Sequence, residues 1–179
     1  FDLSLLRLEK GVFQVLATSG DTALGGDDFD RAIAERMLAE RKKDGLADVV
    51  DEGAVKAALA LARVMKEQLS DRDQTSGRLE LAGVPSFHAL ARPDFDAMIA
   101  SGVKRTLDIA RNVLVDADIA VGEVNGVVLV GGSTRVPLVR AEVAVLIGKP
   151  PLTDIDPDEV VALGAALQAE ALTGGSETL

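Results

Sequence analysis

The sequence contains no cysteine, tryptophan or tyrosine, and its single histidine is His88. The absence of cysteine excludes disulfides, thiolate metal sites and cysteine nucleophiles, and it fits the cytoplasmic location that we expect. A mononuclear zinc site is not expected, because such sites usually take several His or Cys ligands. A Ser-His-Asp triad would need His88, which lies in a predicted strand, and we do not expect one.

Positive charge and long apolar runs are also scarce. The net charge of −10 argues against a nucleic-acid partner, because neutralising phosphates requires a basic face. A single bound nucleotide is not excluded, since it needs only a few local cations and backbone donors. No apolar run approaches the roughly 20 residues of a membrane span, and no signal peptide is visible, so no membrane partner is expected.

Apolar residues make up 47% of the 179 residues, enough to bury the core of one domain or of two small subdomains. Phe1 opens directly into a strand-like segment without an initiator methionine, so we expect the sequence to be a fragment of a longer protein. Strands, intervening helices and a late strand–turn–helix indicate an α/β chain. The middle, about residues 25–99, could be an inserted subdomain.

Turn residues and apolar alternation predict three strand regions. They are a hairpin in residues 2–17 that turns at Glu9-Lys10-Gly11, a second hairpin in TSGRLELAGVPSFHALA that turns near Gly83, and a strand in VNGVVLV that is buried on both faces. Helices are predicted from LGGDDFD to Gly45, over about 51–69 and 93–117, in VPLVRAEVAVLI up to Gly148, and in DIDPDEVVALGAALQAEAL after an Asp156–Glu159 cap.

The segment VVLVGGSTRVP predicts a strand that turns sharply into a helix. Gly131 and Gly132 could let the backbone approach a flat ligand closely, because they carry no side chain. Ser133 or Thr134 could cap the next helix and leave N–H groups for a ligand. The planar guanidinium of Arg135 could stack on an aromatic base. On the residues alone, this ligand contact and an ordinary strand–helix turn are about equally favoured.

The same segment does not match the two commonest nucleotide loops. It lacks the G-x-x-x-x-G-K-[ST] spacing of a Walker A loop. It also lacks G-x-G-x-x-G, the dinucleotide-binding fingerprint, and Pro137 stands where a third glycine would be needed.

Two further segments could contribute to a ligand site. In LGGDDFD, Gly25 and Gly26 precede three acids, which either favour a helix N-terminus or belong to a loop near a nucleotide's phosphates and ribose. The ligand spacing of an EF-hand is missing. Arg63, Lys66 and Ser70 are spaced to share one helix face, which could grip a ribose and a base or could be solvated.

Together and in this order, FDLSLLRL, VLATSGDTALGGDDFD, LSD after Lys66, VVLVGGSTRVPLVR and DIDPDEVVALGAALQAEALTG resemble the nucleotide-binding domain of the 70-kilodalton heat-shock chaperones. The resemblance implies an actin-like, ribonuclease-H-like ATPase fold, of which this chain would be the second lobe. Residues 1–24 and 100–179 would form a sheet-bearing subdomain, and 25–99 a smaller inserted α+β cap. GVFQVLATSGDTALGGDDFD and KPPLTDIDPDEVVALGAALQAE resemble the HscA branch, the chaperones of iron–sulfur cluster assembly, more than the general DnaK branch.

The resemblance also implies that ATP or ADP with Mg²⁺ binds between the lobes of the parent protein. The matching positions are Gly131, Gly132, Ser133, Arg135 and Val136 at the adenosine, Lys66 and Ser70 at ribose and adenine, Asp158 near the adenine pocket, Gly26 on the phosphate side, and Asp2 on Mg²⁺ through water. Arg63 is a departure, because many members carry at this position a Glu that contacts the ribose.

The catalytic set of the family would lie outside this chain. A phosphate loop, Asp-Leu-Gly-Gly-Gly-Thr, is expected immediately before Phe1, and the first lobe should supply the catalytic lysine and the water-orienting acid. We therefore expect no catalytic residue here and no ATP hydrolysis by the isolated chain, although the parent should be an ATPase. The resemblance implies a J-domain cochaperone and an iron–sulfur scaffold client as partners. The alternatives are a general DnaK-type chaperone, a sugar-kinase or actin-like ATPase lobe, and a module that binds no nucleotide.

Overall fold

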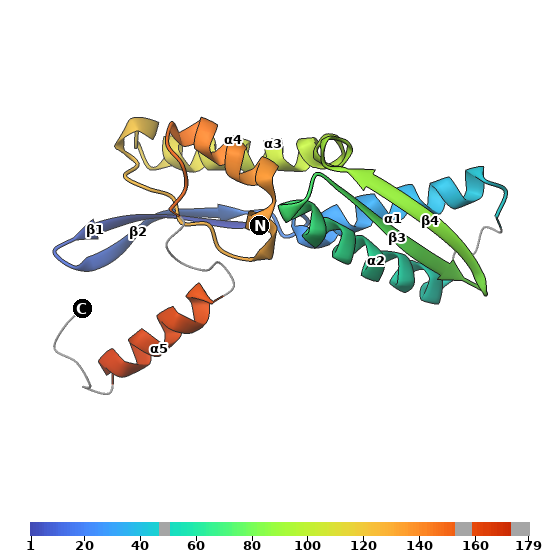
Figure 1. Cartoon of the computed structure of the whole chain (residues 1–179). Coiled ribbons are helices and arrows are strands. Elements are labelled where there is room, and N and C mark those ends of the chain that lie inside the picture. Colours follow the sequence, from blue (N-terminus) through green and yellow to red (C-terminus); the bar gives the residue numbers. More distant parts are fainter. Residues whose placement is uncertain (47–50, 153–158, 173–179) are drawn as a thin grey trace. The chain divides into compact units, whose positions relative to one another are not determined.

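The computed structural model describes residues 1–46, 51–152 and 159–172. The chain forms two compact units, which we call the terminal unit, Phe1–Thr22 with Arg105–Leu179, and the middle unit, Ala23–Lys104. Their elements are labelled in Figure 1. The boundary between the units falls inside helix α3, Arg92–Asp116. That these units are the subdomains of a chaperone lobe stays a prediction, and each unit is described by itself below.

Both sheets found within the described ranges are antiparallel hairpins of two strands. The strands are β1 Asp2–Glu9 and β2 Val12–Gly20 in the terminal unit, and β3 Gln74–Leu81 and β4 Val84–Ala91 in the middle unit. Each pair is joined by a two-residue turn with positive φ at both positions, 51° and 80° at Lys10 and Gly11, and 50° and 77° at Ala82 and Gly83. Such turns match the twist of the strands, and both predicted hairpins are confirmed.

The predicted helices are also present. They are α1 Gly26–Lys43, α2 Glu52–Asp71, α3, α4 Pro137–Ile147 and α5 Val160–Leu172, with short 3₁₀ turns η1 Val121–Glu123 and η2 Gly132–Arg135. The Asp51 side chain begins α2 by accepting a 2.7 Å hydrogen bond from the Ala54 amide. Gly148 ends α4 with a φ of 77°, a left-handed conformation that favours glycine. The predicted Asp156 cap of α5 lies outside the described residues.

The middle unit has a continuous apolar core between its two helices and its hairpin. Helix α1 packs on α2, and α2 packs on β3. Along α1, the predicted positions Phe29, Ile33 and Met37 are all buried. The approach of α2 to β3 is close, because a Cβ at Gly77 would lie 2.5 Å from Leu61 Cδ1. The core therefore fixes α1 and α2 against each other, which places the polar side chains at their edge.

The prediction of a buried strand in VNGVVLV, in the terminal unit, was wrong. Residues 124–130 contain a single parallel bridge, between Val128 and Leu152, and no regular strand. Val128 is 49% exposed and Val130 46% exposed, so neither is covered as a central strand would be. The physical reason is that a strand is stabilised by neighbours along its edges, and in the described residues this segment has only that one bridge. Its β-branched residues alone do not make a strand.

Candidate functional site

A cluster of charged side chains joins the beginning of α1 to the second half of α2. Arg63 Nη2 lies 2.9 Å from Asp27 Oδ1, and Arg63 Nε lies 3.2 Å from Asp30 Oδ2. Lys66 Nζ lies 2.8 Å from Asp30 Oδ1 and donates a 3.0 Å hydrogen bond to the Gly26 carbonyl. We call these five residues the α1–α2 charge cluster. It brings together three of the predicted site residues, namely Gly26, Arg63 and Lys66.

Burial divides the cluster into an inner and an outer pair. The side chains of Asp30 and Lys66 are 4% and 11% exposed, whereas those of Arg63 and Asp27 are 59% and 86% exposed. The inner pair is therefore poorly screened by solvent, and the outer pair is well screened. The hydrogen bond with Asp30 and the charges of both acids raise the pKa of Arg63, so this guanidinium is always charged.

Helical spacing explains why these side chains meet. Asp27 and Asp30 are three residues apart on α1, and Arg63 and Lys66 are three apart on α2, so each pair occupies one face of its helix. Ser70 follows Lys66 by one further turn of α2 and is half-buried. Acids in the first turn of α1 are also favoured by the helix dipole. Both segments could be predicted from the sequence, but the role of Asp30 could not, because it depends on the packing of α1 against α2.

The Gly131 turn, residues 131–136, forms in the terminal unit. Gly131 has φ 87° and ψ 155°, a conformation that is essentially restricted to glycine. The Thr134 amide and hydroxyl both donate to the Gly131 carbonyl, at 3.0 and 2.6 Å, which closes the turn. A Cβ placed on Gly131 would meet no atom within 4 Å. The requirement for glycine is therefore conformational, and the surface beside it is open.

The turn differs from the predicted cap in one respect. Neither Ser133 nor Thr134 caps α4, because these residues form η2 and the helix begins later, at Pro137. The N-cap of α4 is Val136, which makes no side-chain capping bond. The first amides of α4 are therefore not occupied by a side-chain cap, and Arg135 lies exposed just before them. An open glycine turn next to an exposed arginine residue is an arrangement that can receive a flat, aromatic ligand.

The remaining predicted site residues are less informative. Val136 is 2% exposed, so its side chain contributes to the core of the terminal unit. Asp2 is exposed at the start of β1. Across the described residues, no three His, Asp or Glu side chains gather into a metal site. The contact of Asp2 with Mg²⁺ through water stays a prediction. Asp158 lies outside the residues that the structure describes.

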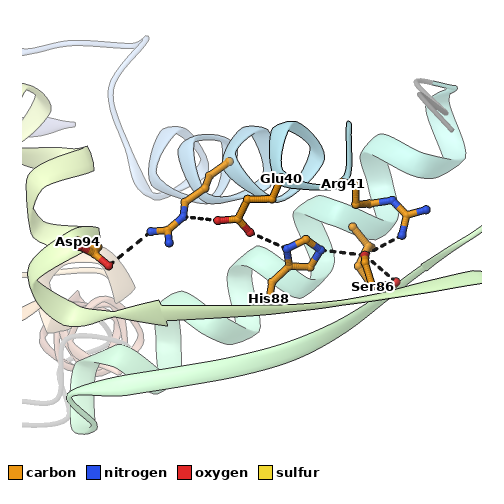
Figure 2. Close-up of polar contacts among 7 residues, drawn as sticks. Glu40, Arg41, Ser86, His88 and Asp94 are labelled. Carbon is orange, nitrogen blue, oxygen red and sulfur yellow. Dashed lines mark hydrogen bonds and ion pairs between the residues drawn. The ribbon is translucent and has the colours of Figure 1, made fainter. Parts of the chain in front are cut away.

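A second polar cluster in the middle unit was not predicted from the sequence (Figure 2). His88 Nδ1 lies 2.8 Å from Glu40 Oε2, and His88 Nε2 lies 2.8 Å from Ser86 Oγ. Arg41 Nη1 donates a 2.6 Å hydrogen bond to the same serine oxygen. Alternation along β4 points Ser86 and His88 to the buried face, where they meet α1. Period-two alternation could have predicted that face, but not the partners on α1.

The order Ser86–His88–Glu40 has the connectivity of a catalytic triad but lacks other features of one. Ser86 is 8% exposed and His88 4%, so a substrate has no access to the hydroxyl. Ser86 Oγ also bonds the Arg41 guanidinium and lies 3.2 Å from the Leu79 carbonyl, which opposes its activation as a nucleophile. The cluster therefore joins buried polar groups of α1 to those of the hairpin.

Comparison with known proteins identifies the family. The model of the Hsp70 protein family matches residues 1–179, the whole of this sequence. The chain belongs to the Hsp70 family. It is 51% identical over 174 residues to the chaperone protein HscA homolog of Shewanella amazonensis, 52% identical over 174 residues to the chaperone protein HscA of Serratia proteamaculans, and 50% identical over 175 residues to the HscA homolog of Bordetella pertussis. Each alignment covers 97% of this chain but only 27–28% of the relative.

The Hsp70 assignment confirms the resemblance that the sequence motifs carried, including its HscA-like character. A mixed α/β chain with small sheets is consistent with the actin-like ATPase fold that this family implies. None of the helices in the described part of the chain combines the length and apolar character needed to cross a bilayer.

Proposed function

We propose that this Hsp70 chain contributes the adenosine-binding half of an ATP/ADP site in a molecular chaperone. The observation that carries the proposal is the Gly131 turn, in which an open left-handed glycine and the exposed Arg135 stand together in a chain matched throughout by the Hsp70 family model. Arg135 would stack on the base. Gly132 and Ser133 would lie against the adenosine, and Val136 would support the turn from within the core.

The family resemblance also assigns nucleotide contacts to residues of the middle unit. Lys66 and Ser70 lie one turn apart on α2 and would meet ribose and adenine, with Gly26 nearer the phosphates. Arg63 is occupied by Asp27 and Asp30, so it would act within the cluster, where a Glu of other members would contact the ribose. Asp158 would line the adenine pocket, and Asp2 would orient a water on Mg²⁺, whose role is to neutralise phosphate charge.

The full-length protein would couple ATP hydrolysis to the binding and release of a client. The HscA-like sequence favours iron–sulfur cluster assembly in the cytoplasm, with a scaffold protein as client and a J-domain cochaperone. The general DnaK-type chaperone is the alternative, and the Hsp70 match favours both over a sugar-kinase or actin-like lobe. Because the matched relatives are more than three times as long, the isolated chain is expected to bind nucleotide weakly and not to hydrolyse it.

Calorimetry with ADP on the full-length protein tests the nucleotide site. Arg135→Ala should weaken ADP binding by about tenfold, or about 1.4 kcal/mol, the magnitude of one partly desolvated cation–π contact. Arg111→Ala is the matched control in the same unit, because Arg111 is exposed and pairs with Asp108 on α3. Equal affinities for the wild type and Arg135→Ala would contradict the assigned role of Arg135. Failure of the full-length protein to bind an iron–sulfur scaffold would favour the general chaperone.

A further inference from the structure

The ammonium of Lys66 is held in place by two acceptors of different kinds. An ammonium carries three N–H donors. One of them donates a 3.0 Å hydrogen bond to the Gly26 carbonyl, and Nζ forms an ion pair with Asp30 Oδ1, 2.8 Å away. The side chain is 11% exposed, so it does not move freely in solvent. Within the described residues these are its two partners, and they leave the ammonium able to donate to an acceptor on a ligand.

Asp30 is buried in the middle unit, whereas the nearby acid Asp27 is exposed. Its side chain is 4% exposed, and its two oxygens are divided between Lys66 and Arg63. A buried carboxylate is costly unless it is paired and hydrogen-bonded, so its position is determined by these two cations. Asp27 differs, because it is 86% exposed and its ion pair among the described residues is with Arg63.

The charge of Asp30 also determines what Lys66 can bind. A lone ammonium attracts phosphate strongly, whereas an ammonium next to a buried carboxylate carries little net charge at short range. Its remaining N–H is still a good donor, and it is better matched to a neutral hydroxyl than to a phosphate. The geometry therefore distinguishes Lys66 from a phosphate-binding lysine.

We propose that Asp30 is a positioning residue, which fixes Lys66 Nζ so that its remaining N–H donates to a ribose hydroxyl of the bound nucleotide. Asp30 itself does not touch the ligand and acts through Lys66. The inference rests on the proposed function, since it assumes that the nucleoside lies against α2. The pairing with Asp30 gives a physical reason why Lys66 would bind a ribose hydroxyl rather than a phosphate.

The test compares ATP with 2′,3′-dideoxy-ATP, which lacks both ribose hydroxyls, by calorimetry on the full-length protein. The wild type should prefer ATP. Asp30→Asn should reduce the ratio of the two affinities by about tenfold, the effect of losing one charge-assisted hydrogen bond, mainly by weakening ATP. Asp27→Asn, which removes an acid that touches Arg63 but not Lys66, should leave the ratio within about twofold. A general loss of stability would weaken both nucleotides together and leave the ratio unchanged.

A second pair of variants covers the case in which Asp30→Asn does not fold. Lys66→Gln and the double variant Asp30→Asn with Lys66→Gln should bind ATP equally, because Asp30 has no effect without Lys66. An additional loss in the double variant would overturn the inference, as would an unchanged ATP preference in Asp30→Asn. If the wild type binds ATP and 2′,3′-dideoxy-ATP equally well, the inference about Asp30 is overturned but the proposed function stays intact. A wild type that binds no adenine nucleotide would overturn both.

Discussion

His88 Nδ1 lies 2.8 Å from Glu40 Oε2, so the buried face of β4 is bonded to the exposed edge of α1 (Figure 2). The His88 side chain is 3% exposed and that of Glu40 is 37% exposed. Burial is the largest single influence on Glu40 and acts to raise its pKa. The hydrogen bonds from His88 and Arg36 and the charges of these two residues lower the pKa, and together they outweigh the effect of burial. The pKa of Glu40 therefore falls below its ordinary value of 4.5.

The lowered pKa of Glu40 predicts a dependence of stability on pH. A carboxyl whose pKa is lower in the folded state stabilises the fold above its unfolded pKa, and the benefit disappears as pH falls through the folded pKa. Glu40→Ala should therefore cost about 1 kcal/mol at pH 7, since the group is partly solvated. The difference from the wild type should shrink below about pH 4.5. Urea unfolding across this pH range measures both quantities.

Glu40→Gln separates the charge of this side chain from its hydrogen bond. The amide oxygen can still accept from His88 Nδ1, so this variant should be more stable than Glu40→Ala at pH 7. Its free energy of unfolding should also vary less with pH than that of the wild type. A cost of Glu40→Ala that stays constant from pH 7 to pH 3 would show that the carboxylate charge is unimportant.

Arg41 is expected to matter more for stability than Arg36, which lies on the same helix. Arg41 is 2% exposed and donates to Ser86 Oγ at 2.6 Å and to the Val84 carbonyl at 3.2 Å. Arg41→Met should lower the free energy of unfolding by about 2 kcal/mol, because one buried and one part-buried acceptor lose a charged donor. Arg36→Met should cost at most about 1 kcal/mol, since its ion pairs are part-exposed. Similar losses in thermal unfolding would contradict this difference.

Elements defined by local residues could be predicted from the sequence. The turns at Lys10-Gly11 and Ala82-Gly83 and the apolar spacing of Phe29, Ile33 and Met37 are short-range signals, so both hairpins and α1 were found where expected. The strand predicted over 124–130 is not formed, because strand formation depends on hydrogen-bonding neighbours elsewhere in the chain.

The candidate site was predictable in its parts but not in its connections. Helical spacing predicted Arg63, Lys66 and Ser70 on one face, and Gly25 and Gly26 at the beginning of α1 were predicted as a possible ligand loop. The bonds of Asp30 to Lys66 and Arg63 join residues more than thirty positions apart. They depend on how α1 packs against α2, which no local pattern of charges specifies.

The two glycines of the Gly131 turn should respond differently to substitution. Gly131→Ala forces a side chain into φ 87° and ψ 155°, and it should lower the free energy of unfolding by about 2 kcal/mol. Gly132 begins η2 without a positive φ, so Gly132→Ala should be far less destabilising. If the backbone there approaches the adenosine, Gly132→Ala should weaken ADP binding in a stable protein. Thermal unfolding and calorimetry on both variants check this, and equal destabilisation would contradict the conformational explanation.

Arg63→Glu tests whether the α1–α2 charge cluster depends on the sign of its charges. The new carboxylate would face Asp27 and Asp30, now 2.9 and 3.2 Å from the guanidinium nitrogens, so like charges would meet where opposite charges met. We expect Arg63→Glu to be less stable than Arg63→Ala, which should itself fall below the wild type. Added salt should reduce the difference, because Arg63 and Asp27 are open to solvent. The charge-swapped double variant, Arg63→Glu with Asp27→Arg, should recover part of the loss. Thermal unfolding at low and high salt measures all four proteins, and a double variant no more stable than Arg63→Glu would show that this pair contributes nothing.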